Sequence, residues 1–509
     1  MNKIWITIIF LCTVIGNLYA NIRLPRIFSE NMVLQREMRV PIWGWADAGE
    51  PINVLIGGHY SETVADNNGR WKLYLGPLDS GGPFEMTVIG KNKISIKNVY
   101  VGEVWVCSGQ SNMAFEVQNS LNPEREINTA NYPLIRHFQV SHTKANTSLE
   151  DIEPSPLNKN PTLDRWQVCS PSTVSDFTGV GYFFGRELFK DLNVPIGLIN
   201  ASWGGTTAEA WTPVDVLENN PKLEEILQDW PNYNNDENWL KLEYETFVAE
   251  LAIARKEGNE VPIYFNEPSV LYNGIIGSFI PYGIKGVIWY QGESNAYRAS
   301  QYKELFPAMI RGWREKWQQG NFPFIFAQLA NYDFEPQVFP ELREAQLNAL
   351  SVPETAMVVT MDIGNPKDIH PKNKQEVGRR LSLAARKLSY YENIEYSGPL
   401  YKSMYISEGK CLLDFNNTGD GMVAKARKTL DGFEIAGVDQ IFHKAKAVIT
   451  GKKVLVWNDD VTKPVAVRYA WHNNPEKSNL YNKIGEKENL PASPFRTDNW
   501  PIIANKRKL

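Results

Sequence analysis

The stretch Val101-Gly-Glu-Val-Trp-Val-Cys-Ser-Gly-Gln-Ser-Asn-Met113 indicates an α/β fold, because it joins a mostly apolar run to a small, polar turn. In an open α/β sheet, the residues that follow the carboxyl ends of the strands form the site. The stretch therefore predicts a buried strand that delivers Ser111 to the edge of a sheet. A hydroxyl beside free backbone N–H groups suits a nucleophile. The alternative reading of the same residues is an ordinary serine–asparagine turn.

Strand and helix patterns alternate along the chain after this stretch. Apolar strand candidates lie at 195–200, 286–290, 323–328 and 356–361, and helical periodicity occurs near 181–192, 300–318, 341–350 and 374–388. This β-α-β rhythm predicts an α/β fold with a doubly wound parallel sheet. We expect this domain to span 101–395. Residues 217–266, which are charged and dotted with Trp and Tyr, are expected to form a helical insertion in it.

The regions on both sides of this domain have a different sequence pattern. Residues 21–100 contain short strands separated by Gly- and Asn-rich turns, which predicts an N-terminal β-sandwich domain. Short strand patterns return over 396–509 and predict a C-terminal β-rich domain.

Residues 1–20 have the pattern of a secretory signal peptide, with a positive start, an apolar run and a small-residue exit at Ala20. The apolar run, residues 4–15, is shorter than the roughly 20 residues that a spanning helix needs. Cleavage after Ala20 is therefore favoured over an uncleaved membrane anchor. The protein is expected to be exported, and so to be periplasmic, attached to the cell surface or secreted.

Composition restricts the partners. The 509 residues carry 53 Lys and Arg against 58 Asp and Glu, a net charge of −5, without a basic run, so nucleic acid is not an expected partner. Signal cleavage would leave Cys107, Cys169 and Cys411, an odd number that cannot form a full disulfide framework. A Cys107–Cys169 bond and free buried thiols both remain open. The six histidines lack metal-ligand spacing, so no metal is expected.

Three further loops follow predicted strands and carry chemistry. Gly204-Gly205 lets the backbone approach a ligand closely, and a glycine N–H is a good oxyanion donor. The loop at 291–295 offers the amides of Gln291 and Asn295, and a carboxylate, Glu293, that can orient a neighbour. A plain strand-to-helix turn and a solvated polar loop are the respective alternatives.

The third loop, residues 361–371, contains the histidine best placed for catalysis. His370 shares this loop with Asp362 and Asp368, and a carboxylate can hold an imidazole in the tautomer that a general base needs. The other histidines lack such surroundings and are expected to serve packing or surface roles.

Together these blocks resemble the sialate O-acetylesterase family of carbohydrate esterases in the SGNH-hydrolase superfamily. The matching strings are Ser108-Gly-Gln-Ser-Asn-Met113, Trp203-Gly-Gly-Thr-Thr-Ala-Glu-Ala-Trp211, Trp289-Tyr-Gln-Gly-Glu-Ser-Asn-Ala296 and Asp368-Ile-His-Pro371. The resemblance implies a flavodoxin-like catalytic domain between β-domains, and hydrolysis of O-acetyl esters on sugars without a cofactor.

The resemblance also implies residue roles. Ser111 would be the nucleophile and His370 the general base, with Asp368 as its orienting acid. Many superfamily members place that acid three residues before the histidine, whereas the spacing here is two, which keeps Asp362 open. The oxyanion donors would be the N–H groups of Ser111 and Gly205 with one amide.

The amide donor could come from Gln291 or Asn295, because the usual Gly-x-Asn-Asp is replaced by Gly292-Glu-Ser-Asn295. Glu293 and Gln110 join the candidate residues for oxyanion or substrate contacts.

The expected reaction is two-step acyl transfer through an acetyl-serine, with an O-acetylated sugar as substrate. Two alternatives stay open: an acetyl esterase for plant glycans such as xylan or xyloglucan, and a carbohydrate-binding protein without activity. The acetyl position and the oligomeric state are not determined by the sequence.

Overall fold

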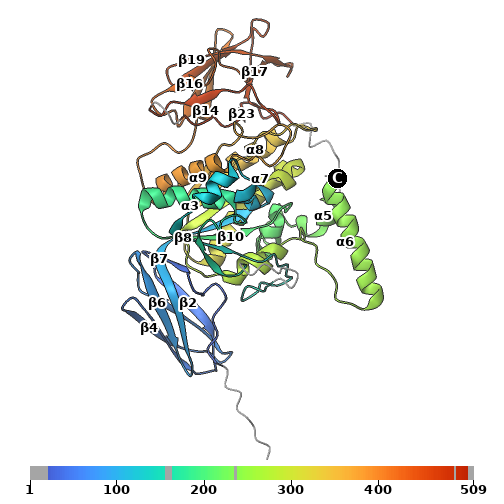
Figure 1. The fold of residues 1–509 in the computed structure, drawn as a ribbon. Coiled ribbons are helices and arrows are strands. Elements are labelled where there is room, and N and C mark those ends of the chain that lie inside the picture. Colours follow the sequence, from blue (N-terminus) through green and yellow to red (C-terminus); the bar gives the residue numbers. More distant parts are fainter. Residues whose placement is uncertain (1–20, 155–162, 234–237, 486–488, 502–509) are drawn as a thin grey trace, which may run out of the picture.

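The computed structural model describes residues 21–154, 163–233, 238–485 and 489–501. The predicted signal peptide lies outside the described residues. The chain has a mixed α/β fold in which one large mixed sheet is accompanied by smaller antiparallel sheets (Figure 1).

The catalytic loops predicted from the sequence follow the strands of the large sheet. These strands are β7 Lys93–Gly109, β8 Tyr132–Gln139, β9 Trp166–Cys169, β10 Ile196–Ser202, β11 Gly286–Tyr290, β12 Phe324–Ala327 and β13 Thr355–Val358. Their order is β13-β12-β11-β7-β10-β8-β9, and all neighbours are parallel except β8 and β9. The predicted α/β fold is therefore confirmed, and the predicted parallel pairing holds from β13 to β8, while the sheet as a whole is mixed. Neither β8 nor β9 was among the predicted strands.

Helices cover both faces of this sheet. The longer ones that pack on it are α3 Gly179–Leu192, α7 Ala299–Trp317, α8 Phe339–Asn348 and α9 Lys374–Ser389. Trp105 of β7 packs edge-on against Phe184 of α3, while Trp289 of β11 packs against Phe306 of α7. Because Trp105 pairs with Gly286, Trp289 points to the opposite face. Thus α3 and α7 lie on opposite sides, with α9 beside α3 and α8 beside α7.

Shorter helical segments fill the connections between these elements. They are α1 Ser111–Ala114, α2 Pro123–Asn128, η1 Val117–Asn119, η2 Ala208–Trp211, η3 Tyr272–Ile276, η4 Gly277–Phe279, η5 Glu293–Arg298 and η6 Ala349–Ser351.

The N-terminal strands are joined to the large sheet through β7. They are β1 Val33–Gln35, β2 Val40–Trp45, β3 Pro51–Ile56, β4 His59–Val64, β5 Arg70–Leu75 and β6 Gly81–Ile89. The first half of β7 pairs antiparallel with β6, and its second half pairs parallel with β10 and β11. The predicted domain boundary at residue 100 therefore lies inside one continuous strand. A separate antiparallel pair is formed by β2 and β5.

Only antiparallel pairing occurs between the named strands at the C-terminal end. One sheet has the order β14-β15-β20-β19 and another the order β18-β17-β21-β23, while β16 pairs with β22. The bounds are β14 Leu400–Ser407, β15 Lys410–Asn416, β16 Met422–Ala424, β17 Phe433–Ala436, β18 Phe442–Lys444, β19 Lys446–Thr450, β20 Lys453–Trp457, β21 Ala466–Tyr469, β22 Leu480–Asn482 and β23 Phe495–Arg496.

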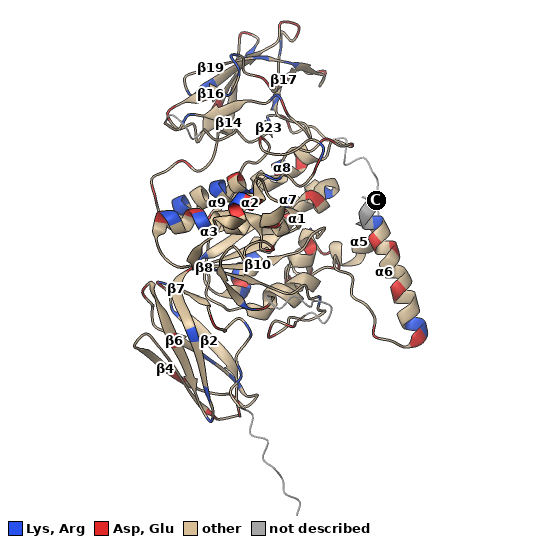
Figure 2. Cartoon of the chain, viewed as in Figure 1, with Lys and Arg blue, Asp and Glu red and all other residues tan. Residues whose placement is uncertain are grey.

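The stretch predicted as a helical insertion contains α5 Ile226–Tyr233 and α6 Asn238–Glu257, preceded by α4 Val214–Glu218. In Figure 1, α6 extends away from the large sheet. Figure 2 shows acidic and basic residues along α6.

Within the described ranges, no helix has the length and apolarity needed to cross a membrane. Cys107, Cys169 and Cys411 are buried free thiols, so Cys107 and Cys169 are not bonded to each other.

Candidate active site

Ser111 stands where β7 ends, and the backbone there needs glycine. Gly109 has a φ of 135°, and a Cβ on it would lie 2.2 Å from the carbonyl oxygen of Tyr290. The N–H of Gln110 donates to that same carbonyl at 3.0 Å. This close strand contact turns the chain so that Ser111 begins the short helix α1 at the carboxyl edge of the sheet.

His370 reaches Ser111 from the loop between β13 and α9. Its Nε2 lies 2.8 Å from the Oγ of Ser111, a hydrogen-bond distance. Its ring stacks on Phe115, with 6.2 Å between centroids and 17° between planes. Burial lowers the pKa of His370, the positive charge of Lys374 lowers it further, and Asp368 opposes both. The imidazole is therefore held mainly in the neutral form that can accept a proton.

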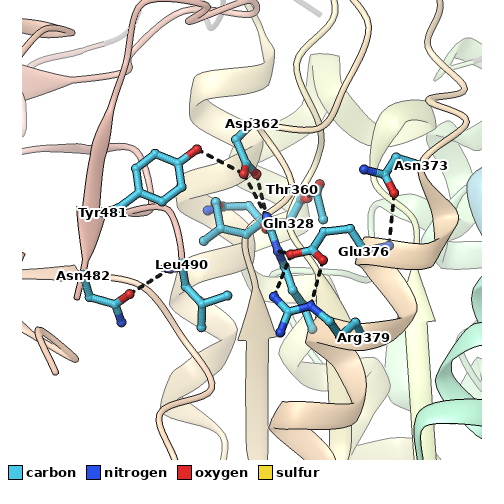
Figure 3. A network of polar contacts seen from close by, with 11 residues as sticks. Gln328, Thr360, Asp362, Asn373, Glu376, Arg379, Tyr481, Asn482 and Leu490 are labelled. Carbon is cyan, nitrogen blue, oxygen red and sulfur yellow. Dashed lines mark hydrogen bonds and ion pairs between the residues drawn. The ribbon is translucent and has the colours of Figure 1, made fainter. Parts of the chain in front are cut away.

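The two candidate partners of His370 have different surroundings. Asp368 Oδ1 lies 3.7 Å from His370 Nδ1 and accepts a hydrogen bond of 2.9 Å from the N–H of His370. Asp362 instead accepts two hydrogen bonds from the buried guanidinium of Arg380, at 2.6 and 2.8 Å. Tyr481, from the C-terminal part of the chain, donates a third bond to Asp362 (Figure 3). Asp368 is thus beside the imidazole, and Asp362 is occupied elsewhere.

The Gly204-Gly205 turn follows β10 and lies against the serine. A Cβ on Gly204 would be 3.4 Å from the Cβ of Ser111, and Gly205 has a φ of 75°. Among the backbone hydrogen bonds between elements and loops of the described chain, the N–H groups of Ser111 and Gly205 have no acceptor. Both are free to donate to an oxygen at this edge.

The amides of the 291–295 loop are buried and already hydrogen-bonded. Gln291 Nε2 donates to the carbonyl of Thr206 at 3.1 Å and to Asn295 Oδ1 at 2.7 Å. Asn295 Nδ2 donates to Glu209 at 2.8 Å, and its Oδ1 also accepts from the N–H of Ala208. These bonds tie the 291–295 loop to the segment that follows Gly205.

Gln110 and Glu293 connect the same loop to the serine turn. Gln110 is 3% exposed, and its Oε1 accepts from the N–H groups of Gly292 and Ser294. Glu293 accepts a hydrogen bond of 2.6 Å from Asn112, the neighbour of Ser111. Burial raises the pKa of Glu293.

Sequence reasoning did not assign two residues of this site, Asn112 and Lys374. Asn112 is buried and hydrogen-bonded to both the 291–295 loop and the 361–371 loop. Lys374 is fully buried and donates to Asn112 Oδ1 at 2.6 Å. A lysine that begins a helix looks like a surface residue in the sequence, so nothing in the pattern could have marked it.

A cavity of about 320 Å³ opens beside the histidine. Its lining includes Phe115, Asn119, Asp368, His370 and Lys372. The opening is large enough for part of a small polar ligand, and it combines an aromatic ring with hydrogen-bonding and charged groups.

A family model described as "Carbohydrate esterase, sialic acid-specific acetylesterase" matches residues 101–241 and 258–387. The chain belongs to this family. The family resemblance that the motifs indicated is therefore confirmed. The match omits 242–257, which make up most of α6.

Family members resemble the chain over nearly its whole length. The sialate O-acetylesterase of Rattus norvegicus is 32% identical over 93% of this chain and 94% of its own. The Homo sapiens protein of that name is 31% identical over 93% and 92%. A carbohydrate acetylesterase of Xanthomonas citri, a solved structure, has a TM-score of 0.81 and 35% identity, and covers 94% of this chain and 100% of its own.

Proposed function

We propose that this family member is a serine esterase that removes O-acetyl groups from sugars, with O-acetylated sialic acid as substrate. The observation that carries the proposal is the 2.8 Å contact between Ser111 Oγ and His370 Nε2 at the carboxyl edge of the parallel sheet. The names of the relatives with 31% and 32% identity support the substrate.

The proposed fold is that of an SGNH hydrolase, with a flavodoxin-like core between β-sandwich-like flanks. Taken in chain order, β7, β10, β11, β12 and β13 lie side by side as 2-1-3-4-5, which is the flavodoxin-like order. Ser111 follows the first of these strands, at the point where the strand order reverses. Export through the predicted signal peptide fits a substrate outside the cytoplasm.

The reaction begins when Ser111 Oγ attacks the acetyl carbonyl carbon while its proton passes to His370 Nε2. The tetrahedral intermediate then collapses, and the sugar oxygen leaves with the proton from His370. Water, deprotonated by the same imidazole, attacks the acetyl-serine and releases acetate, which restores Ser111. Asp368 stabilises the imidazolium that forms between these transfers.

The backbone N–H groups of Ser111 and Gly205 are the proposed oxyanion donors, because they lie at the serine and are not otherwise engaged. Gln291 and Asn295 contribute indirectly, by fixing the loops around Gly205. Gln110 and Glu293 fix the serine turn in the same way.

Lys372 is the proposed contact for the carboxylate of sialic acid. Its side chain is exposed and lines the cavity beside His370. An exposed ion pair contributes up to about 1 kcal/mol, which corresponds to roughly fivefold in affinity. Lys372→Met is therefore expected to raise the KM for an O-acetylated sialic acid about fivefold. The KM for a neutral aryl acetate should stay unchanged.

The test measures acetate release by the wild type and Lys372→Met from four substrates: an O-acetylated sialic acid, acetylated xylo-oligosaccharides, acetylated xyloglucan and an aryl acetate. Release from sialic acid is the expected result. Release from the plant glycans alone would replace the substrate and keep the mechanism. If the wild type released acetate from none of them, a carbohydrate-binding protein without activity would be the better description.

Asparagine variants can show which carboxylate, that of Asp368 or that of Asp362, orients His370. Asp368→Asn is expected to lower kcat about 100-fold with the stability unchanged, because the carboxylate is half-exposed and orients only His370. Asp362→Asn removes the counter-charge of buried Arg380 and is expected to cost about 3 kcal/mol of unfolding free energy. Its folded fraction should keep the wild-type kcat. Kinetics with thermal unfolding check both, and exchanged phenotypes would assign Asp362 to His370.

A further inference from the structure

Lys374 lies at a helix N-terminus and is buried, and both locations are unfavourable for a positive charge. It is the first residue of α9, where the helix dipole disfavours a positive charge, and its side chain is 0% exposed. Burial lowers the pKa of its ammonium to about 7. A sequence that breaks local rules in this way commonly does so at a functional site.

Hydrogen bonds connect Lys374, through Asn112, to the segments that carry Ser111 and His370. Its Nζ donates to Asn112 Oδ1 at 2.6 Å, and Asn112 Nδ2 donates to Glu293 at 2.6 Å and to the carbonyl of Ile369 at 3.0 Å. Asn112 follows Ser111, and Ile369 precedes His370. The side-chain amide of Asn112, which accepts a hydrogen bond from Lys374, therefore links the serine turn to the histidine loop.

The positive charge of Lys374 also acts on the imidazole of His370. Lys374 Nζ lies 4.7 Å from the ring centroid of Phe115 and 5.4 Å from that of Tyr290, and Phe115 stacks on His370. The charged groups that act on His370 are Lys374 from α9 and Asp368 from its own loop. Glu293, from η5, acts on Lys374 and favours its charged form.

We propose that Lys374 is a positioning residue for the esterase reaction: through Asn112 it holds Ser111 in line with His370, and its ammonium lies over Phe115, the ring that stacks on the imidazole. This inference rests on the proposed function and deepens it. Lys374 touches no reacting atom, and its effect reaches the reaction through Asn112 and through the field at His370.

The test compares Lys374→Met, Lys374→Gln and Asn112→Ala. Both Lys374 variants remove the positive charge, so the pKa of His370 should rise and the acid limb of kcat/KM should move up by about one pH unit. Lys374→Met should also lower kcat about 100-fold through misalignment, with KM within threefold. Asn112→Ala keeps the charge and should lower kcat with the acid limb unmoved. Lys374→Gln, which stays polar, carries the test if Lys374→Met does not fold.

Lys387→Met, near the other end of the same helix, is the matched control and should keep the wild-type profile. The same pH profile is measured as the rate at which a fluorophosphonate labels Ser111, which needs no sugar substrate. An unmoved acid limb in a folded, neutral Lys374 variant would overturn the inference, whether or not kcat falls. If the wild type neither releases acetate nor becomes labelled, the proposed function fails instead.

Discussion

Replacing Ser111 with alanine is expected to reduce acetate release by at least about 10⁴-fold, because the variant has no oxygen to form the acetyl-enzyme. The measurement is kcat/KM for the best substrate of the panel, together with fluorophosphonate labelling, which should disappear. KM should change little, since the cavity beside His370 and the backbone donors remain in place.

The stability of Ser111→Ala should stay within about 1 kcal/mol of the wild type, because the side chain is only partly buried. Ser382→Ala is the matched control: it removes a buried hydroxyl of α9 that donates to the carbonyl of Arg379, and it should retain full activity. If Ser111→Ala kept more than about 1% of wild-type turnover, the nucleophile would be another residue.

Replacing His370 with alanine is expected to cost about 10⁴-fold in kcat, because Ser111 then has no base for its proton. Since the two side chains act as one unit, the double variant Ser111→Ala/His370→Ala should be no slower than Ser111→Ala alone. Additive losses would show that the two residues act in separate steps. His472→Ala, which removes an exposed histidine beside Glu434, is the control and should keep activity.

The pH profile gives His370 a second signature. Only the neutral imidazole accepts the serine proton, so kcat/KM should rise with pH through the pKa of His370. Burial and the charge of Lys374 both lower that pKa, which places the acid limb below the ordinary histidine value of 6.5. A limb above 6.5 would mean that Asp368 outweighs both effects.

Local patterns were sufficient for the elements that form the core. The run at 286–290 and the periodicity at 300–318 correspond to β11 and α7, because apolar spacing reports directly which face of an element is buried. By contrast, β8 carries Arg136 and His137 in a buried position, and this polar content hid the strand. The continuity of β7 through the predicted boundary at residue 100 was also missed, because its pairing with β6 on one side and β10 on the other depends on segments far away in the chain.

Some residues of the candidate site could likewise be predicted from the sequence, and others could not. The family, the parallel pairing of the central strands and the loops that carry Ser111 and His370 could be predicted from the sequence, because motifs and strand ends are local features. The contacts of Asp362 with Arg380 and Tyr481, and the hydrogen bond from Lys374 to Asn112, became visible only in the folded chain. Asn112 and Lys374 are 262 positions apart in the chain. Such pairings depend on how distant segments pack, and spacing along the chain carries no information about them.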